Sequence, residues 1–183
     1  MIKGQQKKGE TGIVIKQDIS EKQVKFAYLG IGSNLGNRKK NIEKSKIKLT
    51  DNNIKVVKCS SYYETLSWPN PKNPKFYNIV LKIEIDFNEQ KLLHICKDIE
   101  KSLGRIRAPK NSPRICDIDI LDYDKKRIKN GILLPHPRMH KRNFVLFPLF
   151  EIEKDWKHPI LKDNIKNLIF SLSKDDIRSI KKI

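Results

Sequence analysis

The sequence has few cysteines and no long hydrophobic run. None of its apolar runs approaches the roughly 20 residues needed to cross a bilayer, and the polar N-terminus lacks the apolar core of a signal peptide. The three cysteines, Cys59, Cys96 and Cys116, form no CxxC pair and fall within apolar runs. This pattern predicts buried, reduced thiols and argues against a disulfide framework or a zinc site. We therefore expect a cytoplasmic protein that does not enter a membrane.

Acidic residues are also scarce relative to basic ones. The chain has 39 Lys and Arg against 21 Asp and Glu, a formal net charge of +18. Such a charge attracts nucleic acid, an anionic membrane or a small polyphosphate, and it does not distinguish among them. A biased base composition that favours Lys would give the same excess. Net charge alone therefore assigns no partner.

The length of 183 residues is that of a single domain with one core. Residues 1–24 are polar and Lys-rich, which predicts a basic flexible extension. Residues 25–183 are expected to form the folded domain, because aromatic and β-branched residues recur there in periodic runs.

Hydrophobic periodicity predicts alternating strands and helices between residues 26 and 122. The expected order is a strand at 26–31, a helix at 38–50, strands at 54–63 and 76–86, a helix at 89–103 and a strand at 116–122. This βαββαβ order is that of a ferredoxin-like α+β fold, an antiparallel sheet with both helices on one face. Additional C-terminal helices are expected near 140–151, perturbed by Pro148, and near 164–172, covering one side or edge of the sheet.

Two carboxylates lie two residues apart on the last predicted strand. Side chains alternate along a strand, so Asp117 and Asp119 are expected on one face and Ile118 and Ile120 on the other. Carboxylates this close repel unless a cation lies between them, and Mg²⁺ with substrate phosphates is a common solution. The alternative is an exposed strand whose acids pair with lysines.

A cationic loop immediately precedes this strand. Residues 104–114 contain Arg105, Arg107, Lys110 and Arg114 among turn-forming residues. The arginine fork binds phosphate oxygens in pairs, so this loop can hold a triphosphate; the alternative is a solvated basic loop. A third cluster, at 134–144, contains His136 between two prolines, where a ring N–H can donate to a phosphate.

The glycine-containing turn at 32–37 is not assigned to phosphate. It lacks the Lys-Ser/Thr ending of the Walker motif and the three-glycine fingerprint of dinucleotide-binding proteins.

Five motifs, taken together, resemble one known family. They are Tyr28-Leu29-Gly30-Ile31-Gly32-Ser33-Asn34-Leu35-Gly36, Phe76-Tyr77-Asn78, Gly104-Arg105-Ile106-Arg107, Pro113-Arg114-Ile115-Cys116-Asp117-Ile118-Asp119-Ile120 and Pro135-His136-Pro137-Arg138-Met139. In order and approximate spacing the chain is similar, over residues 26–152, to the 6-hydroxymethyl-7,8-dihydropterin pyrophosphokinase family. Two positions depart from the family: Asn111 stands where a Trp is frequent, and Pro137 where a Tyr often follows the histidine.

The resemblance implies a reaction and a set of site residues. Diphosphate would pass from ATP to the hydroxymethyl group of 6-hydroxymethyl-7,8-dihydropterin, with release of AMP, in folate biosynthesis. Asp117 and Asp119 would bind two Mg²⁺ ions, with ATP as co-substrate, and would be catalytic together with Arg105 and Arg114. The implied ATP-binding residues are Glu100, Arg105, Arg107, Lys110, Arg114, Ile120, His136 and Arg142. The implied pterin-binding residues are Thr65, Leu66, Phe76, Asn78 and Phe144.

Two other functions fit parts of the sequence. A ferredoxin-like sheet with high positive charge is also how RNA-recognition modules are built, but those place aromatics where this chain has Asp117 and Asp119. A pterin-binding protein without catalysis would need neither the acids nor the arginines. We therefore expect ATP and a reduced pterin as partners, without nucleic acid or membrane, on a monomer with possible coupling to neighbouring folate-pathway enzymes.

Overall fold

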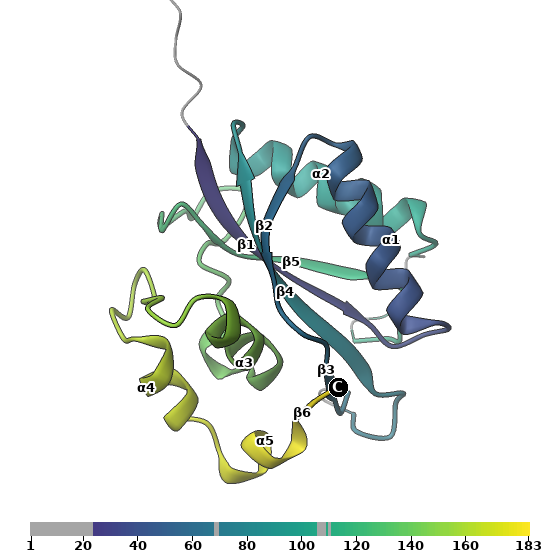
Figure 1. The fold of residues 1–183 in the computed structure, drawn as a ribbon, viewed down its shortest axis with the longest axis vertical. Helices are drawn as coiled ribbons and strands as arrows, with labels where there is room; N and C mark the ends of the chain where they lie inside the picture. Colours follow the sequence, from purple (N-terminus) through teal and green to yellow (C-terminus); the bar gives the residue numbers. More distant parts are fainter. Residues whose placement is uncertain (1–23, 68–69, 106–108, 110) are drawn as a thin grey trace, which may run out of the picture.

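The computed structural model describes residues 24–67, 70–105, 109 and 111–183. It confirms the α+β class, with an antiparallel sheet and several helices (Figure 1). Apart from Val24, the extension predicted at 1–24 lies outside the described residues. The elements are β1 (Lys25–Ser33), α1 (Arg38–Asp51), β2 (Lys55–Cys59), β3 (Tyr63–Thr65), β4 (Phe76–Ile85), α2 (Glu89–Ser102), β5 (Asp117–Tyr123), η1 (Met139–Lys141), α3 (Asn143–Ile152), α4 (Ile165–Phe170), α5 (Lys174–Ser179) and β6 (Lys181–Lys182).

The sheet has the strand order expected for the ferredoxin-like core. β1 lies between β5 and β4, and β2 and β3 both pair with β4; all of these pairs are antiparallel. The prediction of a single strand at 54–63 is wrong in one respect, because β2 ends at Cys59 and a separate strand, β3, begins at Tyr63. Ser60 lies at the break, where its Oγ accepts a hydrogen bond from Val80 N at 2.9 Å. A side chain thus occupies an acceptor position that a backbone carbonyl would fill in an unbroken ladder.

Each face of the sheet buries its own hydrophobic cluster. Leu29 and Ile31 of β1 belong to the cluster beneath α1 and α2, whereas Tyr28 belongs to the cluster beneath α3 and α4. Figure 1 shows α1 and α2 together on one side and the C-terminal helices on the other. The side chains that alternate along β1 therefore pack against helices on both faces.

The cysteines differ in exposure. Cys96 and Cys116 are buried free thiols, as predicted, but Cys59 is a free thiol that is exposed. The prediction of burial is wrong at Cys59 because β2 lies at the margin of the sheet and most of its side chains face solvent. Within the described residues, no helix is long and apolar enough to cross a membrane.

His158 gives the stability of the fold an expected acid dependence. Its ring is buried, and Nδ1 accepts hydrogen bonds from Ile160 N and Leu161 N at 3.2 and 3.1 Å. Burial and the neighbouring His140 lower the pKa of His158 below its ordinary value of 6.5. As the pH falls below about 6.5, His158 of the unfolded chain binds a proton that the folded ring does not bind. The free energy of unfolding therefore decreases by up to about 1.4 kcal/mol per pH unit.

We expect His158→Asn to reduce this acid dependence. The Asn side-chain oxygen can accept both backbone N–H groups in an Asx turn and has no proton to gain in this range. Urea unfolding at pH 7.5, 6.5 and 5.5 would measure both proteins. Equal slopes of unfolding free energy against pH would show that His158 is not responsible.

Candidate active site

A cavity of about 200 Å³ lies where β1, β4 and β5 meet the segment leading into α3. It gathers residues from each charged cluster that the sequence singles out. Its charged lining comprises Arg105, Arg114, Asp117, Asp119, Arg138 and Arg142. Its lining also includes Thr65, Leu66, Phe76, Asn78 and Phe144, the residues predicted for the pterin. Segments distant in sequence thus form one polar cavity with an aromatic portion.

The two aspartates lie on one face of β5, opposite glycines of β1. Asp119 pairs with Gly30 and Asp117 with Gly32 in the antiparallel register. A Cβ at Gly32 would lie 2.9 Å from the side-chain oxygen of Asn78 and 3.3 Å from the ring of Phe76. Gly32 therefore leaves the space that Asn78 and Phe76 occupy beside the carboxylates.

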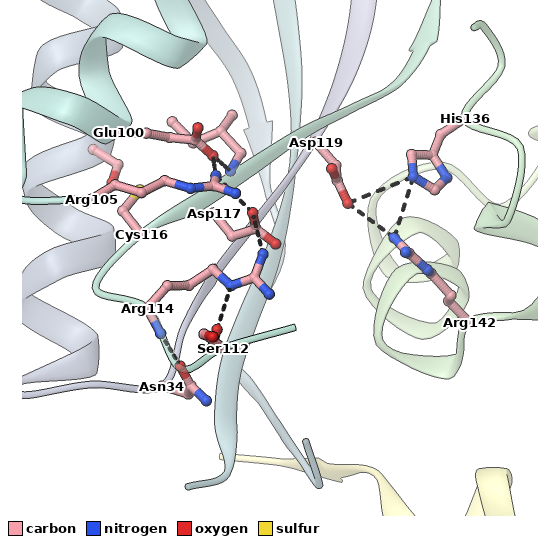
Figure 2. A network of polar contacts seen from close by, with 12 residues as sticks. Asn34, Glu100, Arg105, Ser112, Arg114, Cys116, Asp117, Asp119, His136 and Arg142 are labelled. Carbon is pink, nitrogen blue, oxygen red and sulfur yellow. Dashed lines mark hydrogen bonds and ion pairs between the residues drawn. The ribbon is translucent and has the colours of Figure 1, made fainter. Parts of the chain in front are cut away.

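Asp117 is held by two arginines from the cationic loop. Arg105 and Arg114 each donate from Nη1 to Oδ1 of Asp117, at 2.9 and 3.0 Å, as Figure 2 shows. Arg105 also contacts the buried Glu100, whose Oε1 accepts Ile118 N at 2.7 Å. Burial raises the pKa of Glu100 to about 7, against the opposing effect of the Ile118 N–H and of Arg105. Glu100 thus anchors Arg105 to the start of β5.

Asp119 faces a second cationic group from the far side of the cavity. Arg142 donates from Nη1 to Oδ2 of Asp119 at 2.9 Å, and Nε2 of His136 lies 3.8 Å from the same oxygen (Figure 2). Burial lowers the pKa of His136. Its Nδ1 accepts Arg138 N at 3.1 Å, and Nη1 of Arg142 lies 3.4 Å from Nε2, the ring nitrogen nearer Asp119.

The carboxylate pair fits a hard divalent cation that shares its ligands with a substrate. The side chain of Asp117 is 27% exposed and that of Asp119 is 37% exposed, so both can reach a ligand in the cavity. In the part of the chain that the structure describes, no three His, Cys, Asp or Glu side chains are grouped to hold a metal. Mg²⁺ is typically held by one or two carboxylates, with phosphates and water completing its shell. The donor set here matches that arrangement.

Asn34 ties together three loops around the cavity. Its Oδ1 accepts Arg114 N at 2.7 Å, and its Nδ2 donates to Ser67 Oγ and Pro74 O at 3.2 and 3.1 Å. Its backbone N–H also donates to Arg114 O at 3.1 Å. The buried Asn34 therefore fixes Arg114 relative to the start of β4.

We expect Asn34→Asp to separate these contacts. An aspartate retains the acceptor for Arg114 N but loses both N–H donors, and Pro74 O would then face a buried negative charge. The expected cost is about 2–3 kcal/mol of unfolding free energy, measured by urea denaturation. Asn37→Asp serves as a matched control, because the exposed Asn37 caps α1 as an acceptor and Asp caps equally well. If Asn34→Asp loses no more unfolding free energy than the control, the contacts of Asn34 do not hold these loops together.

At the aromatic part of the cavity, Asn78 and Thr65 form a buried polar pair. Asn78 Nδ2 donates to Thr65 Oγ1 at 2.9 Å across β3 and β4. Phe76 and Phe144 are half-buried and line the same cavity. Amide and hydroxyl groups next to two aromatic rings suit a flat heterocycle with hydrogen-bonding edges.

Comparison with known proteins identifies the family. Residues 28–154 match the family described as 7,8-dihydro-6-hydroxymethylpterin-pyrophosphokinase. The chain belongs to this family. The 2-amino-4-hydroxy-6-hydroxymethyldihydropteridine pyrophosphokinase of Aquifex aeolicus is 40% identical over 140 residues, which cover 76% of this chain and 87% of that protein.

Longer relatives contain the same unit. The folic acid synthesis protein fol1 of Pneumocystis carinii is 37% identical over 154 residues, which cover 84% of this chain and 21% of that protein. A crystal structure of Plasmodium falciparum HPPK-DHPS superposes with a TM-score of 0.71 at 15% identity, covering 90% of this chain and 48% of that one. The chain thus spans about a fifth of the Pneumocystis protein and about half of the Plasmodium one, and the structural likeness supports the shared fold.

The residues implied by the family resemblance do not all lie in the cavity. Arg107 and Lys110 fall outside the described residues. The side chain of Ile120 is buried in the core beneath α1 and α2, on the face of β5 opposite Asp119. Arg138 lines the cavity and was not assigned a role from the sequence, although it belongs to the histidine motif.

Proposed function

We propose that the chain transfers diphosphate from ATP to the hydroxymethyl group of 6-hydroxymethyl-7,8-dihydropterin, releasing AMP. The single observation that carries this proposal is the joining of two substrate sites in one cavity. One part presents paired carboxylates among arginines, and the other presents a buried amide–hydroxyl pair beside two aromatic rings. The family is named for a pyrophosphokinase, and the matching residues, 28–154, include those of both parts of the cavity.

The phosphate part of the cavity suits a substrate of high negative charge. Its described lining contains four arginines and two aspartates, so it has an excess of positive charge before any metal binds. We assign Asp117 and Asp119 to two Mg²⁺ ions, which would neutralise phosphate charge and polarise the transferring group. Arg105 and Arg114, oriented through Asp117, would contact the phosphate oxygens in pairs.

The chain's own residues then act by positioning and by electrostatic stabilisation. Asn78 and Thr65 would hydrogen-bond the edge of the pterin, with Phe76 and Phe144 against its faces, and Leu66 would close that end. This orientation would turn the hydroxymethyl oxygen toward the β-phosphorus of ATP. His136, through Nε2, and Arg142 would stabilise charge on the nucleotide from the α3 side. No covalent enzyme intermediate is required.

We also propose that the protein works in the cytoplasm beside other enzymes of folate synthesis. All three cysteines are free thiols, which suits a reducing compartment. The Pneumocystis and Dictyostelium relatives are folic acid synthesis proteins of which the matched unit is about a fifth. Their organisation supports coupling of this activity to neighbouring steps, although we expect the catalytic unit itself to be a monomer.

The test is nucleotide chromatography after the protein has been incubated with ATP, Mg²⁺ and 6-hydroxymethyl-7,8-dihydropterin. AMP should form only when the pterin is present and should disappear when EDTA removes the metal. ADP in place of AMP would indicate transfer of a single phosphoryl group. No turnover would exclude the proposed reaction.

A further inference from the structure

The C-terminal segment at 173–183 is here called the C-terminal clasp. It pairs with β3, the strand that carries Thr65 in the proposed pterin-binding part of the cavity. It comprises α5 and β6 and lies beyond the region that matches the family, which ends at residue 154. β6 pairs with β3 through Tyr63 opposite Lys182, and Ile183 N donates to Tyr62 O at 3.0 Å. Because β3 ends at Thr65, the clasp supports the strand that presents Thr65 to the cavity.

The clasp also contacts the start of α3, next to Phe144, through Asn143. This side chain is 8% exposed, and its Nδ2 donates to Asp176 O at 2.6 Å and to Ser179 Oγ at 3.0 Å. Its Oδ1 accepts the backbone N–H of Phe144 at 2.6 Å. The clasp therefore anchors the residue that immediately precedes Phe144, and so the start of α3.

Glu151 connects the other end of α3 to both β3 and the clasp. Its carboxylate accepts Tyr63 Oη at 2.8 Å, Ser61 Oγ at 2.7 Å and Lys182 Nζ at 3.0 Å. Two turns of α3 thus separate the Asn143 anchor from the Glu151 anchor. The Glu151 anchor holds the helix against β3 directly, and the Asn143 anchor holds it through the clasp, whose β6 pairs with β3.

A second cavity, of about 520 Å³, lies between the clasp, the end of β3 and the start of α3. Thr65, Leu66 and Phe144 line it as well as the first cavity, and Asp175, Asp176 and Ser179 line it from the clasp. The clasp therefore forms the outer boundary of the space behind the pterin end. Arg138 and Arg142 also line both cavities, whereas Asp117, Arg105 and Arg114 of the phosphate part come from β5 and the loop before it.

We propose that the C-terminal clasp is a positioning element for the pterin: by holding β3 and the start of α3, it sets the separation between Thr65 and Phe144. Asn143 and Lys182 are its positioning residues. This inference rests on the proposed function and names a determinant of pterin affinity outside the residues that would touch the substrate. It requires that loosening the clasp weakens pterin binding more than nucleotide binding, because Arg105 and Arg114 are held by Asp117 and not by the start of α3.

Two variants and one control test this selectivity. Asn143→Ala removes both contacts to α5, and Lys182→Ala removes the ion pair with Glu151. Lys181→Ala removes the same charge from the same short strand and is the matched control. Pterin fluorescence titrations with a non-hydrolysable ATP analogue present give the pterin Kd, and steady-state kinetics give kcat and the KM for ATP.

We expect Asn143→Ala to raise the pterin Kd by about fivefold to tenfold, the usual effect of losing buried hydrogen bonds. Lys182→Ala should raise it by about twofold to threefold, because its ion pair is partly exposed. The KM for ATP should stay within about twofold in both, and Lys181→Ala should match the unmodified protein.

Unchanged pterin affinity in Asn143→Ala and Lys182→Ala, or equal weakening of pterin and ATP, would overturn the inference. Thermal unfolding of each variant identifies loss of the fold; if Asn143→Ala unfolds, Ser179→Ala removes one of its contacts and takes its place. Failure of the proposed function is distinguishable, because the unmodified protein would then form no AMP from ATP and the pterin.

Discussion

Replacing Asp117 with Asn should lower kcat by about 10³-fold, the scale expected when a preorganised charge at a reacting centre is lost. Asp117 accepts hydrogen bonds from both Arg105 and Arg114, so its charge holds these two arginines together. An Asn keeps the shape of the side chain but supplies a neutral and weaker ligand for Mg²⁺. The measurement is initial AMP formation at saturating ATP and pterin, with Mg²⁺ varied from below to above its saturation.

Asp124→Asn is the matched control for this change. Asp124 is an exposed acid just beyond the same strand, and its positive φ of 51° is well tolerated by Asn. We expect it to retain full activity. A loss of less than about tenfold in Asp117→Asn, with the fold intact by circular dichroism, would remove Asp117 from the reacting centre.

Arg114→Ala should lower kcat by about 10²- to 10³-fold. Arg114 donates to Asp117 from Nη1 and to Ser112 O from Nε at 3.1 Å, and Asn34 fixes its backbone. Its guanidinium is therefore preorganised before substrate binds, which is the condition under which a cation contributes most to the transition state. Single-turnover rates with the ATP–Mg²⁺ complex and pterin in excess would report the chemical step directly.

Substitution of Arg114 with Lys tests whether the fork matters in addition to the charge. Lys retains one positive charge but cannot contact Asp117 and two phosphate oxygens in the same plane, so we expect it to recover only part of the rate. Arg127→Ala, at an exposed position on the surface, should have no effect. A defect confined to the KM for ATP, with kcat unchanged, would mean that Arg114 binds the ground state and transition state equally.

Strand periodicity predicted the central features of the site. The alternation of Asp117 and Asp119 with Ile118 and Ile120 places the acids toward the cavity and the isoleucines in the core, as the structure confirms. This prediction succeeds because the period of a strand leaves only two choices of face, and burial decides between them. The order of strands and helices along the chain could be predicted because each element carries its own hydrophobic pattern, and the βαββαβ order then indicates how the strands are arranged in the sheet.

Other features depend on tertiary contacts that leave no local pattern. From the sequence, Asn34 is an ordinary turn residue. Its hydrogen bonds form only because Ser67, Pro74 and Arg114 lie close to it in the fold. The split of one predicted strand at Ser60 likewise depends on Val80 of a neighbouring strand. Sequence periodicity reports burial, and it does not report which distant groups a polar side chain will reach.

Of the C-terminal elements, α3 and α4 lie close to the predicted helices, whereas α5 and β6 are not predicted, for a different reason. α5 has only six residues, most of them polar, and none of them is buried. β6 has two lysines. Neither carries a hydrophobic period, although Ser173 before Asp175 and Asp176 is a helix N-terminus signal that the sequence does offer.

The position of β1 between β4 and β5 also constrains how the protein can fold during synthesis. A nascent chain that ends after α2 can pair β1 with β4, but the other edge of β1, with Gly30 and Gly32, still waits for β5. The strand that covers this edge is the one that brings Asp117 and Asp119. Addition of β5 to the sheet and delivery of the carboxylates are therefore one folding event, whereas His136, Arg142 and Phe144 are synthesised later.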